Sequence, residues 1–185
     1  MDIAYSQNTA DLLPILIAPH KSLKSRAREV RDEDMDYVRG LLPRMFNAMY
    51  KAPGIGLAAP QVDVGLRFFI VDLGKKRGNT DTDEPGEPFV LINPKIIGAS
   101  TELATREEGC LSLPNQYADV TRPAAVKISY MTPEGKRAEI EGEELMAACL
   151  QHEFDHLDGV LFVDHLSALK RNMIMRRLAK EQRQK

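Results

Sequence analysis

The sequence predicts an α+β fold in which short antiparallel or mixed strands pack around a central helix, with another helix towards each end of the chain. The order of the patterns leads to this prediction, because a segment with a helical period comes first, several short apolar runs follow, and two further helical segments come last. Apolar residue types make up 43% of the 185 residues, which is enough to bury a core. We therefore expect one domain over residues 1–185.

The first third is expected to hold one short strand and one long helix. Residues 15–17 are apolar and could seed a strand. Residues 32–51 have the helical period, and Gly40 and Pro43 within them predict a kink or a late start. Residues 53–56 then break the helix. The apolar residues that recur at steps of three and four are Met35, Val38, Leu42, Met45 and Met49.

The middle of the chain is expected to form strands. Residues 66–71 are mostly apolar and predict a buried strand, whereas residues 74–88 contain no aliphatic residue and predict a surface loop. Further strands are predicted at residues 89–92, 96–97, 125–130 and 137–140, the last two joined by a turn at residues 131–135.

Two helices are predicted in the last third. Apolar residues from Leu145 onward run into residues 151–157, and Gly159 is a stop signal for this helix. Residues 167–184 predict a second helix, so that the end of the chain, about residues 168–185, is a basic helix or tail.

Charge and cysteine content narrow the class of protein. Lys and Arg number 25 and Asp and Glu number 27, a balance that argues against a surface built throughout for nucleic acid or anionic membrane. Two cysteines cannot make a disulfide framework. No apolar stretch approaches the length of a membrane span, and the N-terminus lacks the pattern of a signal peptide. We therefore expect a cytoplasmic protein.

Two histidines make the central helix a candidate metal-binding helix. His152 and His156 are four residues apart, so they lie on one helix face and both imidazoles can bind one divalent ion. The carboxylate of Glu153 can reach the side of the metal where water binds without occupying a ligand position. A metal lowers the pKa of its water, and a neighbouring carboxylate can accept the proton and return it to a leaving group.

A tetrahedral catalytic site needs a third protein ligand, for which the chain offers three candidates. His165 lies nine residues after His156, which is close but not excluded. Cys149 shares the helix face, but it is about 10.5 Å from His156 along the helix axis, too far for both to bind one ion. Cys110 lies in residues 107–112, which are predicted to form a loop-like turn. It follows Gly109, which would let the backbone approach the metal closely, and it is the leading candidate.

Three segments of the chain resemble the three signature motifs of the bacterial peptide deformylases, in the same order and at similar separations. They are residues 54–61 (GIGLAAPQ), residues 108–112 (EGCLS) and residues 151–159 (QHEFDHLDG). The resemblance extends more loosely from about residue 15 to residue 169. It implies that the chain removes the formyl group from the initiator methionine of nascent polypeptides and releases formate.

The resemblance also implies roles for individual residues. Cys110, His152 and His156 would be the metal ligands, and Glu153 the general base and acid. The family uses Fe²⁺ in the cell, which Ni²⁺, Co²⁺ or Zn²⁺ can replace, whereas the ligand set by itself favours zinc. The residues that would supply donors to the developing oxyanion are Gln61, through its side-chain amide, and Leu111, through its backbone N–H.

Substrate contacts follow from the same resemblance. The backbone of Ile55, Gly56 and Gly109 would pair with the peptide as with an added strand. Leu145 and Cys149, one helical turn apart, would line the methionine pocket. Candidates for orienting the histidines are Glu108, Asp155 and Arg122.

Two residues depart from the common pattern of the family. Tyr117 stands where many relatives carry Arg, and Arg106 stands where an apolar residue at the rim of the pocket is common. Both departures affect which substrate side chains the site would prefer beyond the first residue, and neither touches the metal chemistry.

The C-terminal segment suggests a partner. Residues 168–185 contain seven Lys or Arg against the single acid Glu181, which fits either a solvated helix face or docking to ribosomal RNA.

Two other functions stay open from the sequence: a general metallopeptidase, if His165 completes the site, and a non-catalytic, ribosome-associated metal-binding module. The presence of Glu153 and Gln61 argues against the second, because a purely structural metal site needs neither.

Overall fold

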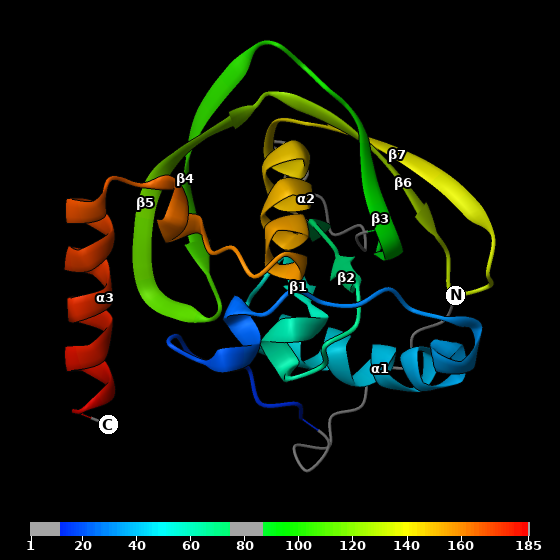
Figure 1. Ribbon diagram of the computed structural model, residues 1–185, viewed down its shortest axis with the longest axis horizontal. Helices are drawn as coiled ribbons and strands as arrows, with labels where there is room; N and C mark the ends of the chain where they lie inside the picture. The colour runs from blue at the N-terminus through cyan, green and yellow to red at the C-terminus, as the bar shows by residue number, and fades with distance from the viewer. Residues whose placement is uncertain (1–11, 75–86, 185) are drawn as a thin grey trace.

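A computed structural model describes residues 12–74 and 87–184 (Figure 1). These residues form a five-stranded sheet in the order β1-β2-β3-β6-β7 and a separate two-stranded sheet, β4-β5, and every strand pair in both is antiparallel. The larger sheet consists of β1 (Gly56–Ala58), β2 (Phe68–Val71), β3 (Phe89–Ala99), β6 (Ala125–Met131) and β7 (Arg137–Glu143). The smaller sheet consists of β4 (Leu103–Cys110) and β5 (Leu113–Pro123).

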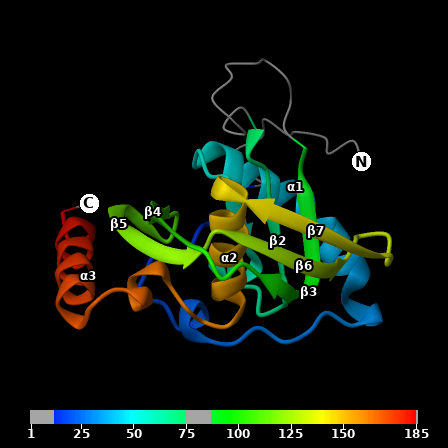
Figure 2. The ribbon, with the colours of Figure 1, turned by 90° about the horizontal axis from the view of Figure 1, so that it is seen from above.

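Three α-helices accompany the sheets: α1 (Met35–Lys51), α2 (Glu144–Leu157) and α3 (Ala168–Gln182). Figures 1 and 2 both show α2 in the middle, with the five-stranded sheet on one side and the β4–β5 pair on the other. Helix α3 lies beyond the β4–β5 pair. This arrangement confirms the predicted α+β fold with its central helix. Short 3-10 turns lie at Lys21–Lys24, Asp32–Asp34, Ala59–Val62 and Phe162–His165.

The strand β2 is apolar throughout because both of its faces are buried. Phe68 and Ile70 pack into one apolar cluster, which contains the buried face of α1. Phe69 and Val71 pack into a second cluster, which contains the buried face of α2. Successive side chains of a strand point to opposite faces, so a four-residue apolar run is what a strand between two helices requires. The strand predicted at residues 66–71 is thereby confirmed.

The helix α1 begins at Met35 and runs through Gly40 and Pro43, so the late start that these two residues predicted does not occur. Residues Asp32–Asp34 form a 3-10 turn and the α-helix begins at Met35. Pro43 lies inside the helix without ending it. The residues after it, Met45 and Phe46, are almost completely buried, and burial of side chains of this size offsets the backbone hydrogen bond that a proline removes.

Two predictions about strands are wrong. Residues 15–17 form no strand; this segment instead ties two parts of the chain together, because Leu16 N–H donates to the carbonyl of Gln61 and Ala18 N–H to that of Ser112. The segment around Cys110, predicted as a loop-like turn, is the end of strand β4. Charged residues such as Arg106 and Glu107 interrupt the apolar alternation of β4, so the usual strand signal is absent from its sequence.

The remaining predictions of helices and strands agree with the structure. The strands predicted at residues 89–92 and 96–97 are one strand, β3, whose pairing with β6 shifts register twice. The helices predicted in the last third correspond to α2 and α3, and Gly159, with a φ of 72°, follows the end of α2. The surface loop predicted at residues 74–88 falls almost wholly outside the described residues. Among the described residues, no helix is both long enough and apolar enough to cross a membrane.

Candidate metal centre

Three potential metal ligands meet between the end of β4 and the C-terminal half of α2. The sulfur of Cys110 and one ring nitrogen each of His152 and His156 all lie within 4.8 Å of one another. The separation of Cys110 Sγ and His156 Nε2 is 3.3 Å. Around a tetrahedral ion with ligand bonds of about 2.0–2.3 Å, donor atoms lie about 3.3–3.8 Å apart. This pair therefore already has the separation that a shared ion needs.

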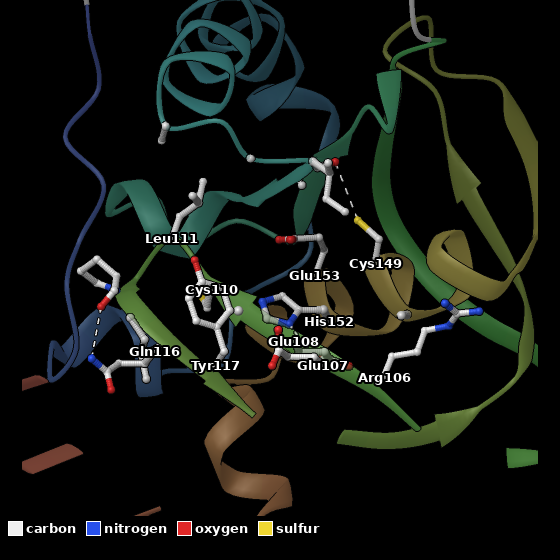
Figure 3. Close-up of a pocket in the computed structure, with 18 of the residues that line it drawn as sticks. Arg106, Glu107, Glu108, Cys110, Leu111, Gln116, Tyr117, Cys149, His152 and Glu153 are labelled. Carbon is white, nitrogen blue, oxygen red and sulfur yellow. Dashed lines mark hydrogen bonds and ion pairs between the residues drawn. The ribbon is translucent and has the colours of Figure 1, made fainter. Parts of the chain in front are cut away.

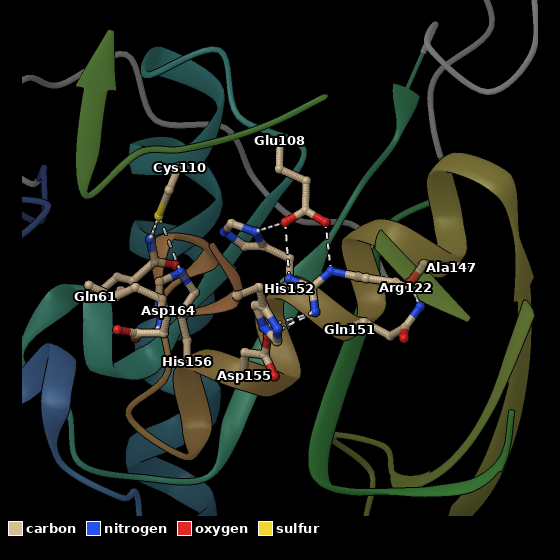
Figure 4. Close-up of polar contacts among 12 residues, drawn as sticks. Gln61, Glu108, Cys110, Arg122, Ala147, Gln151, His152, Asp155, His156 and Asp164 are labelled. Carbon is tan, nitrogen blue, oxygen red and sulfur yellow. Dashed lines mark hydrogen bonds and ion pairs between the residues drawn. The ribbon is translucent and has the colours of Figure 1, made fainter. Parts of the chain in front are cut away.

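A buried charge network orients His152. Its Nδ1 lies 3.0 Å from Glu108 Oε2, and the same carboxylate accepts two hydrogen bonds from Arg122, of 2.6 and 3.0 Å (Figure 4). Arg122 in turn donates to Asp155 at 2.8 Å. Because Nδ1 is engaged in this way, Nε2 is the ring nitrogen of His152 that is left for the cluster.

The pKa values within this network follow from burial and from neighbouring charges. Burial alone would raise the pKa of Glu108, but hydrogen bonds to His152 and Arg122 outweigh it and hold the pKa at about 2. Burial lowers the pKa of His152, yet its hydrogen bonds to Cys110 and Glu108 raise it well above the ordinary value. The same anionic neighbours that attract a proton to His152 would also attract a divalent cation. Burial, followed by the charge of His152, lowers the pKa of His156 and keeps that imidazole neutral, as metal binding requires.

The carboxylate of Glu153 is buried and lies against Gly56. A Cβ atom at residue 56 would sit 2.4 Å from Glu153 Oε1, so glycine is the residue that leaves room for this carboxylate. Its other oxygen, Oε2, is buried and forms no hydrogen bond with any described residue. Burial raises the pKa of Glu153 to about 7. A carboxylate with that pKa can both accept and release a proton near neutral pH.

The side-chain amide of Gln61 is fixed with its N–H groups towards Cys110 and Ser112. Its oxygen accepts a 2.8 Å hydrogen bond from the backbone of Ala58, so the nitrogen is the atom that faces Ser112 Oγ at 3.1 Å and Cys110 Sγ at 3.6 Å. Leu111 follows Cys110 in the turn between β4 and β5. The hydroxyl of Ser112 is a contact that the sequence did not indicate, although Ser112 lies inside the EGCLS motif.

A cavity of about 850 Å³ opens beside the three donors (Figure 3). The residues expected at the substrate line it: Ile55, Gly56, Gln61, Gly109, Leu111, Leu145 and Cys149, together with Cys110, His152 and Glu153. His156 is 1% exposed and is not part of the lining. Ala148, on the same helix as Leu145 and Cys149, is a lining residue that the sequence did not indicate.

The two other candidates for the third ligand are engaged elsewhere. Cys149 Sγ donates to the carbonyl of Ile55 at 3.7 Å, and burial raises the pKa of its thiol well above the ordinary value. His165 Nε2 lies 2.7 Å from Asp155 Oδ2. Neither residue is part of the cluster of donors.

The two departures from the family pattern both lie at the cavity. The ring of Tyr117 covers Gly109, where a Cβ atom would come within 2.6 Å of it, and the side chain is largely exposed. Arg106 lines the cavity from β4. Gln116, also in the lining, is buried and donates to Glu181 of α3 at 3.1 Å.

Comparison with known proteins gives one consistent result. Residues 12–172 match the model of the family described as polypeptide deformylase. The chain is 48% identical over 169 residues to a peptide deformylase of Methylocella silvestris, which covers 91% of this chain and 84% of that protein. It is similar to a crystal structure of a peptide deformylase from Legionella pneumophila, with a TM-score of 0.82, 41% identity and coverage of 93% and 96%. The peptide deformylase of Ehrlichia chaffeensis in complex with actinonin has a TM-score of 0.85, 34% identity and coverage of 93% and 98%.

Proposed function

The chain belongs to the polypeptide deformylase family, and from this premise we propose that it is the metal-dependent hydrolase that removes the N-formyl group from the initiator methionine of nascent polypeptides. In this reaction water cleaves the formamide C–N bond, formate leaves, and the methionine amine is released. The observation that carries the proposal is the cluster of Cys110, His152 and His156 with the buried Glu153 carboxylate beside it.

We propose that Cys110, His152 and His156 hold one divalent ion, Fe²⁺ in the cell, with Zn²⁺, Ni²⁺ or Co²⁺ able to occupy the site in the purified protein. Such an ion supplies a Lewis acid that polarises the formyl oxygen and lowers the pKa of water. One thiolate and two imidazoles, spaced for tetrahedral binding, support the ligand set. The preference for iron rests on the resemblance to the family.

Glu153 is proposed to carry the proton. Its carboxylate accepts a proton from the attacking water and delivers it to the departing amine, so that one group serves as base and then as acid. A pKa of about 7 and an oxygen without a protein partner support this role. The amide N–H of Gln61 and the backbone N–H of Leu111 are proposed to stabilise the oxyanion, supported by the fixed orientation of the Gln61 amide.

The peptide is proposed to lie along the cavity as an added strand. The backbone of Ile55, Gly56 and Gly109 would bind its main chain, and Leu145 and Cys149 would contact the methionine side chain. Their common position in the lining of one cavity supports this assignment. The first three residues border β1 and β4, two short strands whose edges suit such pairing.

We further propose that residues 1–185 work as a single cytoplasmic domain that docks to ribosomal RNA through α3. Ile174 and Leu178 of α3 are buried and hold the helix against the molecule, while a face with Arg176, Arg177 and Lys180 is exposed. A face of this charge suits a phosphate backbone.

The test of the reaction is formate release from a formyl-Met tripeptide by protein purified without oxygen. We expect rapid release that a chelator abolishes and that added Ni²⁺ restores, and no release of acetate from the acetyl-Met tripeptide. A metal-loaded protein that releases no formate would contradict the proposed function. Glu153→Ala should keep its metal and lose turnover, whereas turnover in this variant would remove Glu153 from the reaction.

A further inference from the structure

We propose that Arg106 gives this enzyme a second class of substrate: N-formyl peptides whose first side chain is methionine sulfoxide rather than methionine. The inference rests on the proposed deformylase activity and concerns the same cavity. The observation that carries it is the exposed side chain of Arg106, which has no ionic partner among the described residues and lines the same cavity as the proposed methionine contacts.

The position of Arg106 follows from the alternation of strand β4. Arg106, Glu108 and Cys110 are two residues apart along the strand, so their side chains leave the same face. Glu108 reaches His152 on α2 from that face, and Arg106 therefore also faces α2. It lines the cavity together with Leu145, Ala148 and Cys149 of that helix. In the view of Figure 3, His152 lies between Cys110 and the Arg106 guanidinium.

No carboxylate neutralises Arg106 within residues 12–74 and 87–184. Glu108, its neighbour on the same face, already accepts two hydrogen bonds from Arg122 and contacts His152. Glu144 lines a small recess together with Arg106, and Glu107 lines the cavity next to it. Neither forms an ion pair with Arg106 among the described contacts. The N–H donors of Arg106 are thus available to a ligand that enters the cavity.

These donors match a sulfoxide better than a thioether. The sulfur of methionine is only a weak acceptor, so a guanidinium next to it gains little. Oxidation to the sulfoxide adds a polar oxygen at that sulfur. An apolar pocket would reject this oxygen, because it would be buried without a partner, whereas Arg106 can donate to it.

The reaction itself is unchanged. Water cleaves the formamide C–N bond, formate leaves and the amine takes up the proton that Glu153 has accepted from the water. The sulfoxide gains and loses no electrons. No oxidant or reductant is therefore needed. The additional substrate would be nascent chains whose initiator methionine has been oxidised before the formyl group is removed.

The experiment compares kcat/KM for formyl-Met-Ala-Ser, formyl-Met(O)-Ala-Ser and formyl-Met-Glu-Ser, on wild type and on Arg106→Met, Arg106→Lys and Arg137→Met. The readout is the ratio of sulfoxide to methionine substrate within each protein, so a general loss of activity cancels. Arg137 is an exposed arginine of β7 outside the cavity lining and serves as the matched control.

We expect Arg106→Met to lower the ratio of sulfoxide to methionine kcat/KM by about tenfold or more, because a hydrogen bond from a charged donor strengthens binding by about that factor. Arg106→Lys should lie in between, and Arg137→Met should match wild type. An equal ratio in wild type and Arg106→Met would overturn the proposal. A selective loss on formyl-Met-Glu-Ser would also overturn it, because Arg106 would then serve the second side chain. Absence of formate from every substrate would instead contradict the deformylase activity.

Discussion

Gly56 is the residue on which the position of the Glu153 carboxylate depends. A methyl group at this position would come within 2.4 Å of Glu153 Oε1, and the buried carboxylate would have to move. We expect Gly56→Ala to lower kcat/KM for a formyl-Met tripeptide by about a hundredfold, because a displacement of about 1 Å at a reacting group has an effect of that size. Metal content, measured by atomic absorption, should not change.

Gly65 provides the control for this substitution, since a Cβ atom there would meet no atom within 4 Å. Gly65→Ala should keep full activity. Full activity in Gly56→Ala as well would show that Glu153 tolerates the shift and would remove the steric argument.

Glu108 connects the metal centre to the buried arginine behind it. Replacement by Gln keeps the shape but removes the charge that Arg122 and His152 both contact. We expect Glu108→Gln to weaken Co²⁺ binding by about 10–100-fold, the usual effect of losing a residue that orients a ligand. Titration against a chelating dye measures this affinity.

The matched control is Glu107→Gln, one residue away along β4, because Glu107 is exposed and has no described contact with His152 although it also lines the cavity. This substitution removes the same charge from a side chain that does not contact His152. Equal affinities for the two variants would mean that only the overall charge matters at this site.

At the scale of single elements, α3 allows the proposed ribosome contact to be separated from catalysis. We expect replacement of Arg176, Arg177 and Lys180 by Gln to weaken cosedimentation with ribosomes and to reduce the slope of log K against log salt by about 0.7–0.9 for each lost phosphate contact. Activity on a formyl-Met tripeptide should be retained, because these side chains are exposed and outside the cavity.

An equivalent change elsewhere controls for net charge: Lys95, Lys136 and Arg137 are also exposed. Their replacement by Gln should leave ribosome binding intact. Equal binding by the two triple variants would exclude α3 as the docking element.

Asp164 joins the turn before α3 to two other segments. It accepts a hydrogen bond from Leu161 N–H at 2.8 Å, pairs with Lys24, and lies 3.9 Å from Arg171. Burial would raise its pKa, but the hydrogen bond from Lys24 and the other contacts lower it below the ordinary value of 3.8. A carboxylate with a lowered pKa stabilises the folded state above its ordinary pKa and loses that contribution as the pH falls through the lowered value.

We therefore expect Asp164→Asn to reduce the free energy of unfolding at pH 7 by about 0.5–1.5 kcal/mol, with a smaller difference below pH 3.8. Urea denaturation of matched metal-free samples measures both values. Asp36→Asn is the control, because the side chain of Asp36 is 98% exposed. If Asp164→Asn lowers the free energy of unfolding by the same amount at both pH values, the charge of Asp164 does not stabilise the fold.

For the molecule as a whole, the sequence predicts elements that bury apolar residues with a regular period. The strand β2 and the helices α1 and α2 were predictable for that reason. The β4–β5 hairpin was not, because Arg106, Glu107 and Glu108 interrupt the apolar alternation that marks a strand, even though its pairing is local. The missed strand is also the one that carries Cys110.

The candidate site was predictable to a similar extent. Helical spacing brings His152 and His156 together and keeps Cys149 apart, since these relations are local to α2. The choice between Cys110 and His165 is a matter of tertiary structure, so local spacing left it open. The contact of Glu153 with Gly56 joins α2 to β1 and could not be derived from either segment alone.

The three proposed metal ligands come from two separate parts of the fold: His152 and His156 from α2, and Cys110 from the β4–β5 sheet, which is not hydrogen-bonded to the five-stranded sheet. This division has a consequence for stability. Cys110 and His156 are 46 residues apart, and an ion bound to both would close that stretch of chain into a loop, much as a disulfide does. For a loop of this length, the chain-entropy model gives about 4 kcal/mol of stabilisation through restriction of the unfolded chain. The ion required for hydrolysis would then also act as a cross-link, so that loss of the ion would lower the stability of the fold as well as remove the chemistry.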